Sequence, residues 1–237
     1  MRNDKNIIFT TSWDDGHSND IKLAKILDNY GIKGTFYIPI VSIGKWLSKE
    51  ILIEISRNHE IGCHTITHCS LTEVTIKKAK EEIKKSKDQL ENILNKKINC
   101  FCYPKGKYNE KIKDIVKNCG FICARTIERF NFNIPNDLFE MGTTIQTLNF
   151  KRDILKVLKI TKSPIISINS LNWLYLAKFM FDRMLVTGGV YHLWGHSWNI
   201  ERRNFWEKLE NFLDYVAHRK NVKYLTNGEL ARELMGR

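Results

Sequence analysis

Two pairs of residues in this chain have the types and spacing that metal-dependent hydrolysis needs. His64 and His68 stand four residues apart, which on a helical turn places both imidazoles on one face, within reach of a single ion. Asp14 and Asp15 are adjacent, so one carboxylate could bind the ion while the other faces a reacting water molecule. Two histidines and one carboxylate leave coordination positions open for water and substrate. Each pair also has a plain structural interpretation, as packed histidines and as a turn before Gly16.

A second group of residues could handle protons and developing charge. His192 and His196 flank Trp194, and in a strand all three side chains would point to the same side. A histidine near an activated water is suited to protonate a leaving amine, although a core histidine under aromatic cover explains this segment equally well. The turn at 104–106, Pro-Lys-Gly, has backbone amides that could face a substrate oxygen, or it is an ordinary loop.

The elements that must position these groups alternate short apolar runs with helical patterns. This alternation predicts an α/β fold with parallel strands, built from about six or seven strand–helix units in one domain. The polar groups fall where strands end, which is where chemistry gathers in barrel-like α/β folds. Strands are expected at 6–13, 35–40, 60–65, 98–103, 121–126, 189–196 and 222–225.

Helices are expected between these strands. Ser18 or Asn19 could cap the first helix, and Ser48 starts the second. The spacing of Ser70 and Glu73 predicts a capping box that opens a long helix, which includes the lysine-rich stretch 77–87. Further helices are expected at 109–118, 153–160, 171–184, 204–219 and 227–235, with a long loop at 127–149.

Composition limits the class of protein. The 237 residues, 43% of them hydrophobic, suit one domain with one core. No apolar run approaches the length of a membrane span, and the first ten residues hold only a three-residue apolar patch, which argues against a signal peptide. Six cysteines without C-x-x-C spacing are expected to be reduced thiols. Together these features predict a cytoplasmic protein.

The net charge of +12 allows two interpretations. The charge could serve a polyanionic partner, such as nucleic acid, a phosphorylated sugar carrier or anionic lipid, or it could reflect a lysine-rich solvated surface. Because no aromatic–basic motif accompanies the charge, we expect a solvated surface and no nucleic-acid partner.

The motifs, taken in order, resemble those of the polysaccharide deacetylases (carbohydrate esterase family 4, the NodB homology domain). Any one motif is weak, but the ordered set spans about residues 6 to 235 and is specific. By this resemblance residues 1–237 form one catalytic domain, a single-domain α/β distorted (β/α)7-type barrel. The matching segments are 11–16 (TSWDDG), 34–37 (GTFY), 64–68 (HTITH), 101–106 (FCYPKG) and 193–197 (LWGHS).

The resemblance also implies roles for residues. Asp14 would be the general base and His196 the general acid. The metal, most often zinc, with cobalt or another divalent ion as an alternative, would be bound by Asp15, His64 and His68. The oxyanion and substrate would be held by the backbone N–H of Lys105 and by Tyr103, Trp194 and Arg125.

The reaction implied is removal of the N-acetyl group from an amino sugar. The metal would polarise the amide carbonyl and activate a water molecule, with Asp14 taking its proton and His196 protonating the departing nitrogen. We expect a cytoplasmic acetamido sugar, nucleotide-linked or lipid-linked, rather than an intact cell-wall polymer. The alternatives are hydrolysis of another non-peptide C–N bond, such as a cyclic amide, and a catalytically silent glycan-binding homologue.

The sequence departs from the family pattern at two places. The third motif commonly carries an arginine that orients the base, and here Cys102 stands in its place, so Arg125 at the end of the next strand could substitute. The acid that would orient the catalytic histidine is not evident. The candidates for it are Asp137, Glu140 and Glu201.

Overall fold

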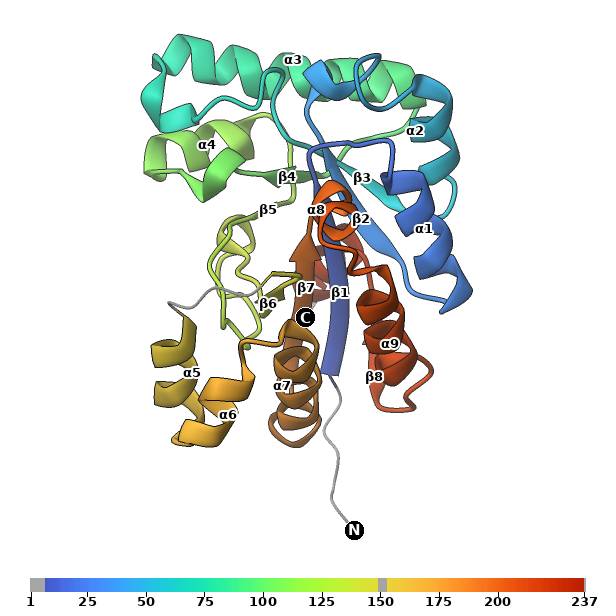
Figure 1. Ribbon diagram of the computed structural model, residues 1–237. Helices are drawn as coiled ribbons and strands as arrows, with labels where there is room; N and C mark the ends of the chain where they lie inside the picture. Colours follow the sequence, from blue (N-terminus) through green and yellow to red (C-terminus); the bar gives the residue numbers. More distant parts are fainter. Residues whose placement is uncertain (1–6, 149–152, 237) are drawn as a thin grey trace.

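A computed structural model of the chain describes residues 7–148 and 153–236. Residues 6 and 149, at the ends of an expected strand and an expected loop, lie outside the described residues. The described strands form one parallel sheet, in the order β5-β4-β3-β2-β1-β7-β6, with β8 beside β1. The predicted single-domain α/β fold, a curled (β/α)7-type sheet with helices around it, is confirmed (Figure 1). The strands are β1 (Ile7–Asp14), β2 (Gly34–Ile38), β3 (Glu60–Cys63), β4 (Cys100–Cys102), β5 (Cys123–Arg125), β6 (Ile145–Gln146), β7 (Gly189–Gly195) and β8 (Val222–Tyr224).

Strand β1 is the centre of the sheet. All eight of its residues are buried, as expected for a parallel strand covered on both faces. β7 pairs with β1 from Ile7 to Trp13. Along the other side of β1, β8 pairs with its first half and β2 with its second half. The strand that carries Asp14 at its end is therefore held along both edges.

One stretch of chain joins the two edges of the sheet. The N–H of Met141 donates to the Ala124 carbonyl, and the Met141 carbonyl accepts from the Thr126 N–H, so this residue pairs with β5. Three residues later the Thr144 N–H donates to the His192 carbonyl of β7. The sheet is thereby curled toward a barrel. β6 lies in this stretch, where the sequence predicts only a loop.

Helices surround the sheet, with α7 and α9 on either side of β1 and β7 in Figure 1. As predicted, the Ser48 side chain caps α2, accepting from the Ile51 N–H at 3.2 Å. Asn19 precedes α1, but its side chain makes no capping hydrogen bond. The short helices α6 and α8 were not expected. The helices are α1 (Asp20–Asn29), α2 (Lys49–Ile55), α3 (Ile76–Leu94), α4 (Glu110–Asn118), α5 (Asp153–Thr161), α6 (Pro164–Asn169), α7 (Trp173–Thr187), α8 (Ser197–Arg202), α9 (Trp206–Val216) and α10 (Asn227–Met235), with 3₁₀ turns at Ile40–Ser42, Leu71–Glu73, Pro104–Gly106 and Leu138–Glu140.

The predicted capping box at Ser70 and Glu73 is wrong. The Ser70 side chain makes no capping hydrogen bond, and the residues after it form a 3₁₀ turn. Thr75 is the cap of the long helix α3, accepting from the Lys78 N–H at 3.2 Å. Glu73 forms an ion pair with Lys107 instead, so its carboxylate serves a contact between loops rather than a helix start.

The six cysteines are free thiols, as predicted, and four of them are buried. Within the residues that the structure describes, no helix is both long enough and apolar enough to cross a bilayer.

A buried histidine makes the fold sensitive to acid. His192 is 1% exposed and shares a 2.8 Å hydrogen bond with Ser12, and burial, helped by the nearby charge of Arg125, lowers its pKa to about 3. Since this pKa is lower in the folded chain than in the unfolded chain, the unfolded chain binds the proton more tightly. Stability therefore falls as the pH falls from about 6.5 toward 3.

We expect the His192→Gln variant to lose part of this acid sensitivity. Between pH 6 and 4.5 the free energy of unfolding of the metal-free wild type should fall more steeply than that of the variant, by up to about 1.4 kcal/mol per pH unit. Urea unfolding at several pH values measures both slopes. The control is His218→Gln, at a histidine in an exposed position, which should keep the wild-type slope. Equal slopes for wild type and His192→Gln would contradict the expectation.

Candidate metal centre

The ends of five strands bring polar side chains together at one end of the curled sheet. Asp14 is the last residue of β1, Cys102 of β4 and Arg125 of β5. His64 follows β3 directly, and His196 follows β7. The carboxyl ends of parallel strands all lie at the same end of the sheet, so residues far apart in the sequence meet here.

Asp15, His64 and His68 form a cluster that could hold one ion. The Asp15 Oδ1 atom lies 3.4 Å from His68 Nε2 and 3.9 Å from His64 Nε2. One ligand atom from each of the three lies within 4.8 Å of the others. Ligands about 2.0–2.1 Å from a tetrahedral zinc ion stand roughly 3.4 Å apart, so a small inward movement completes the geometry. The three residues fit a divalent metal.

The backbone is held in an uncommon conformation at two of these residues. Asp15 has φ 83° and His68 has φ 58°, in a region that non-glycine residues visit rarely and at a cost of about 1–3 kcal/mol each. The Asp15 N–H donates to the Tyr37 carbonyl at 3.2 Å, and the His68 N–H donates to Thr65 Oγ1 at 3.0 Å. These bonds fix the turns that aim both side chains at the cluster.

His64 is held in the form that a metal requires. Its Nδ1–H donates to the Cys102 carbonyl at 2.8 Å, which leaves the Nε2 lone pair facing Asp15. Burial lowers the pKa of His64 to about 4, so the ring is neutral at physiological pH. A neutral, oriented imidazole is ready to bind a cation.

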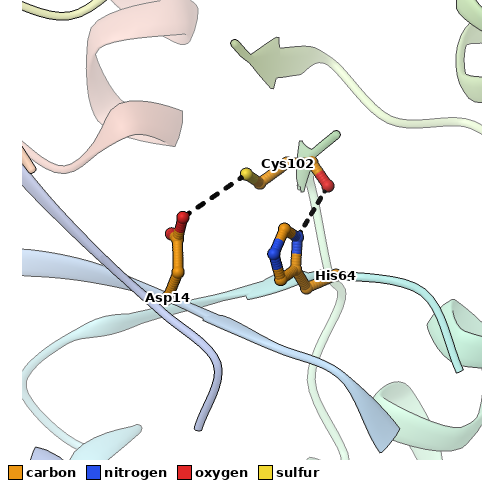
Figure 2. Close-up of side chains that lie close together, drawn as sticks. All are labelled: Asp14, His64 and Cys102. Atoms are coloured by element: carbon orange, nitrogen blue, oxygen red, sulfur yellow. Dashed lines mark hydrogen bonds between the residues drawn. The ribbon is translucent and has the colours of Figure 1, made fainter. Parts of the chain in front are cut away.

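A second cluster, made by Asp14, His64 and Cys102, also satisfies the distance criterion for a metal (Figure 2). The Arg125 guanidinium occupies it, however, by donating to both carboxylate oxygens of Asp14 and to Cys102 Sγ, the latter at 2.9 Å. Burial also raises the pKa of the Cys102 thiol well above its usual value, so a thiolate ligand is disfavoured. A fixed positive charge and a protonated thiol both oppose a cation at this position.

Asp14 is buried, yet its carboxyl group is ionised. Burial alone would raise its pKa, but the charge of Arg125, with smaller contributions from His64 and His196, lowers the pKa below its usual value. Arg125 is itself fully buried, and its guanidinium lies 4.8 Å from the centre of the Trp194 ring. Arg125 of β5 thus contacts Asp14 as an arginine of the third motif would. The geometry supports the substitution expected from the sequence.

His196 approaches a different carboxylate oxygen of Asp15 from the one that His64 and His68 approach. Its Nε2 atom is 3.6 Å from Asp15 Oδ2, and its ring packs between Trp194 and Trp198, with centroids 5.6 and 5.2 Å away. The Nδ1 atom is buried and has no hydrogen-bond partner within the described ranges. Two indoles and, at Nε2, the Asp15 carboxylate contact this ring, whereas no carboxylate reaches Nδ1 among the described residues.

None of the three acids expected to orient His196 does so. Asp137 and Glu140 form ion pairs with Lys113, and Glu201 accepts from the Trp206 indole at 2.5 Å. That prediction is wrong because these carboxylates are engaged by cations and donors outside the site.

The residues expected to hold the oxyanion and substrate fall into two groups. Lys105 sits in the turn after β4 with φ 56°, and no acceptor outside its own turn takes its backbone N–H among the residues described. Trp194 borders the site through Arg125 and His196. The Tyr103 side chain, by contrast, is fully buried and its hydroxyl donates to the Phe139 carbonyl. The prediction that Tyr103 binds substrate is therefore wrong for its side chain.

A cavity of about 390 Å³ opens beside the cluster and was not anticipated from the sequence. Its lining residues are Asp15, His17, Trp46 and Trp198. Trp46 is 46% exposed, which is unusual for so large an apolar side chain, and the Trp198 indole N–H donates to Asp15 at 3.1 Å. Sequence reasoning missed Trp46 because the loop that carries it has no motif.

Comparison with known proteins decides the family. The model of the polysaccharide deacetylase family matches residues 2–124, more than half of the chain. The chain belongs to the polysaccharide deacetylase family. The family resemblance inferred from the sequence is confirmed. A curated relative, the uncharacterized protein YlxY of Bacillus subtilis, is 27% identical over 97 residues, which are 40% of this chain. The chain spans only 29% of that relative's length.

Solved structures of deacetylase-family proteins share the fold. A family protein from Mycobacterium smegmatis has 15% identity and a TM-score of 0.74, covering 100% of this chain and 92% of its own. The Streptococcus pyogenes deacetylase PplD, solved with acetate, has 22% identity and a TM-score of 0.54 over 56% of this chain and 62% of its own. BA3943 of Bacillus anthracis, a pseudoenzyme of the same esterase family, has 15% identity and a TM-score of 0.56 over 97% and 66%. At these identities the similarity establishes the fold alone.

Removing one ligand should empty the metal centre of this deacetylase-family protein. We expect His68→Ala to lower zinc affinity by more than about 100-fold, because a lost ligand costs at least as much as a lost partner of a ligand. Competition with a chromophoric chelator measures the affinity. The matched control is His17→Ala, which removes an imidazole from the neighbouring cavity but not from the cluster. Loss of zinc from Cys102→Ala, with zinc retained by His68→Ala, would place the ion in the other cluster.

Proposed function

We propose that this chain is a metal-dependent N-deacetylase that hydrolyses the acetamido group of an amino sugar. The family supports deacetylase chemistry. The observation that carries the finer proposal is the pairing of an ionised, arginine-held Asp14 with the three-residue cluster next to it. Two adjacent aspartates in such different surroundings are suited to different tasks.

Asp14 is the proposed general base. The charge of Arg125 lowers its pKa, so Asp14 stays ionised across the working pH range and is always able to accept a proton. A divalent ion held by Asp15, His64 and His68 supplies, when bound, polarisation of the acyl oxygen and a water molecule acidic enough to give its proton to so weak a base. The Arg125 guanidinium holds the Asp14 carboxylate in place during this transfer.

His196 is the proposed general acid. An amine is a poor leaving group unless its nitrogen is protonated as the C–N bond breaks, and the Nε2 atom of His196 borders the cluster, 3.6 Å from Asp15 Oδ2. The two flanking indoles keep the ring from rotating. The backbone N–H of Lys105, which no acceptor outside its own turn takes in the described part of the chain, would stabilise the negative charge that develops on the acyl oxygen.

The cavity between Trp46 and Trp198 is the proposed site of the sugar ring. Its volume of about 390 Å³ is near the lower end of the range of roughly 300–1,000 Å³ for small-molecule sites. Indole faces suit the apolar C–H face of a pyranose. A small cavity favours a single acetamido sugar or its nucleotide- or lipid-linked derivative over an extended polymer. The proposed place of action is the cytoplasm.

Substitution of Asp14 should separate catalysis from metal binding. We expect Asp14→Asn to lower kcat by about 10²–10⁴-fold while zinc stays bound, since the residue moves a proton and does not hold the ion. Asp15→Asn should lose both zinc and turnover. Acetate release, measured on nucleotide-linked and lipid-linked acetamido sugars beside chitin oligomers and peptidoglycan, gives the rate. If Asp14→Asn empties the site and Asp15→Asn does not, the two aspartates have exchanged roles.

Trp46→Ala should weaken sugar binding and leave the chemistry intact. We expect KM for the acetamido sugar to rise about tenfold with kcat little changed, because an aromatic contact is worth about 0.5–1.5 kcal/mol or slightly more with its buried area. Trp46→Phe should lie near the wild type. A control substrate without a sugar ring, N-acetylethanolamine, should be hydrolysed with the same kcat and KM by the wild type and both variants. A fall in kcat on both substrates would show that Trp46 supports the site rather than the sugar.

A catalytically silent glycan-binding protein is the second candidate. The observation in its favour is that, within the described ranges, no carboxylate bonds to Nδ1 of His196, the proposed acid. Sugar binding to the zinc-loaded protein by calorimetry, with no acetate release from any substrate, would favour this function over the deacetylase.

A further inference from the structure

Asp20 is a buried acid that none of the roles above uses. It is the first residue of α1 and is 0% exposed. Burial, with a smaller contribution from the negative charges of Asp15 and Asp14, raises its pKa to about 7, although its hydrogen bonds from Ser197 and His17 oppose the shift. A carboxyl group kept in such surroundings is costly unless its hydrogen bonds accomplish something that an apolar side chain would not.

The two oxygens of Asp20 join two different loops. Oδ2 accepts from the backbone N–H of His17 at 3.1 Å, two residues after the metal ligand Asp15. Oδ1 accepts from the hydroxyl of Ser197, the residue directly after His196. A single carboxyl therefore connects the loop after β1 to the start of α8.

This connection adds a polar contact beside a histidine that has few of its own. Among the described residues the Nδ1 atom of His196 has no hydrogen-bond partner, while its ring contacts two indoles and its Nε2 atom lies 3.6 Å from Asp15 Oδ2. The pairing of β7 with β1 reaches Gly195, and beyond it the Trp198 indole N–H donates to Asp15 at 3.1 Å. The Asp20–Ser197 bond ties the residue directly after His196 to the loop after β1.

We propose that Asp20 is a positioning residue that holds the His196 loop against the Asp15 loop and so sets the distance from the proton donor to the departing nitrogen. The proposal rests on the proposed deacetylase function. It predicts that breaking the connection harms only those reactions in which the leaving group needs a proton.

Two substrates separate this role from a general structural one. An acetamido sugar releases an amine, which requires protonation by His196. 4-Nitrophenyl acetate releases a phenolate, which departs without a proton, while its attack by water still depends on Asp14 and the metal. A positioning residue for the acid changes the ratio of the two rates, whereas damage to the fold or to the metal site lowers both.

Ser197→Ala is the decisive variant because it removes one hydroxyl and leaves the Asp20–His17 bond in place. We expect its kcat on the acetamido sugar to fall by about 10²-fold, the cost of a misplacement of roughly 1 Å, with ester hydrolysis and zinc content unchanged. Asp20→Asn should stay near the wild type, since its amide group can still bond to both partners. Ser86→Ala, at another fully buried serine far along the chain in α3, should leave both rates unchanged.

The proposal is overturned if Ser197→Ala lowers the amide and ester rates equally, or if it does not lower the amide rate. A wild type that hydrolyses the ester but none of the acetamido sugars would instead contradict the deacetylase function. In that case crystal structures of wild type and Ser197→Ala still decide the role of Asp20. The proposal requires the His196 ring to move away from Asp15 in the variant, and an unmoved ring would refute it.

Discussion

The buried ion pair between Arg125 and Asp14 is the interaction on which the site depends. Arg125 ends β5 near one edge of the sheet, and Asp14 ends the central strand β1, so the pair bridges the end of the barrel. Neither group could be buried alone, because removing one partner of such a pair leaves an uncompensated charge that costs about 3–5 kcal/mol. The contact that satisfies the buried guanidinium therefore also keeps Asp14 ionised.

The ion pair also divides the work between adjacent aspartates. Asp14 faces a guanidinium, which opposes a cation at its carboxylate, while the left-handed turn at Asp15 directs the next carboxylate to two imidazoles. The Cys102 carbonyl completes the arrangement by fixing the His64 tautomer. The backbone of Cys102 thus holds His64, while its small side chain leaves room for Arg125 and accepts a hydrogen bond from it. An arginine reaching in from the next strand can occupy the place because the residue at the motif position is small.

Much of the fold and part of the site could be predicted from the sequence. Short apolar runs located the principal strands, because the buried positions of a strand must carry apolar side chains. The order of the motifs brought His64, His68 and the two aspartates into one site. Local rules failed where long-range contacts decide: Ser70 has the spacing of a cap, but Glu73 forms an ion pair with Lys107, and the helix starts at Thr75.

Other parts of the site carry no signal in sequence. β6 has two residues, too few to show a period, and is defined by its partner β7. Asp20 resembles an ordinary acid at a helix start until Ser197 is seen beside it. Trp46 lines the cavity, and nothing in its local sequence indicates this. In each case the partner lies far away in the chain, so that spacing alone conveys nothing about it.

Anomalous diffraction at the zinc absorption edge would show whether one ion is held beside the Arg125-bound pocket and not within it. Zinc-loaded crystals should give a single peak about 2 Å from Asp15, His64 Nε2 and His68 Nε2, with Asp14 still bonded to Arg125. A peak between Asp14, His64 and Cys102, with the arginine displaced, would refute this placement of the ion.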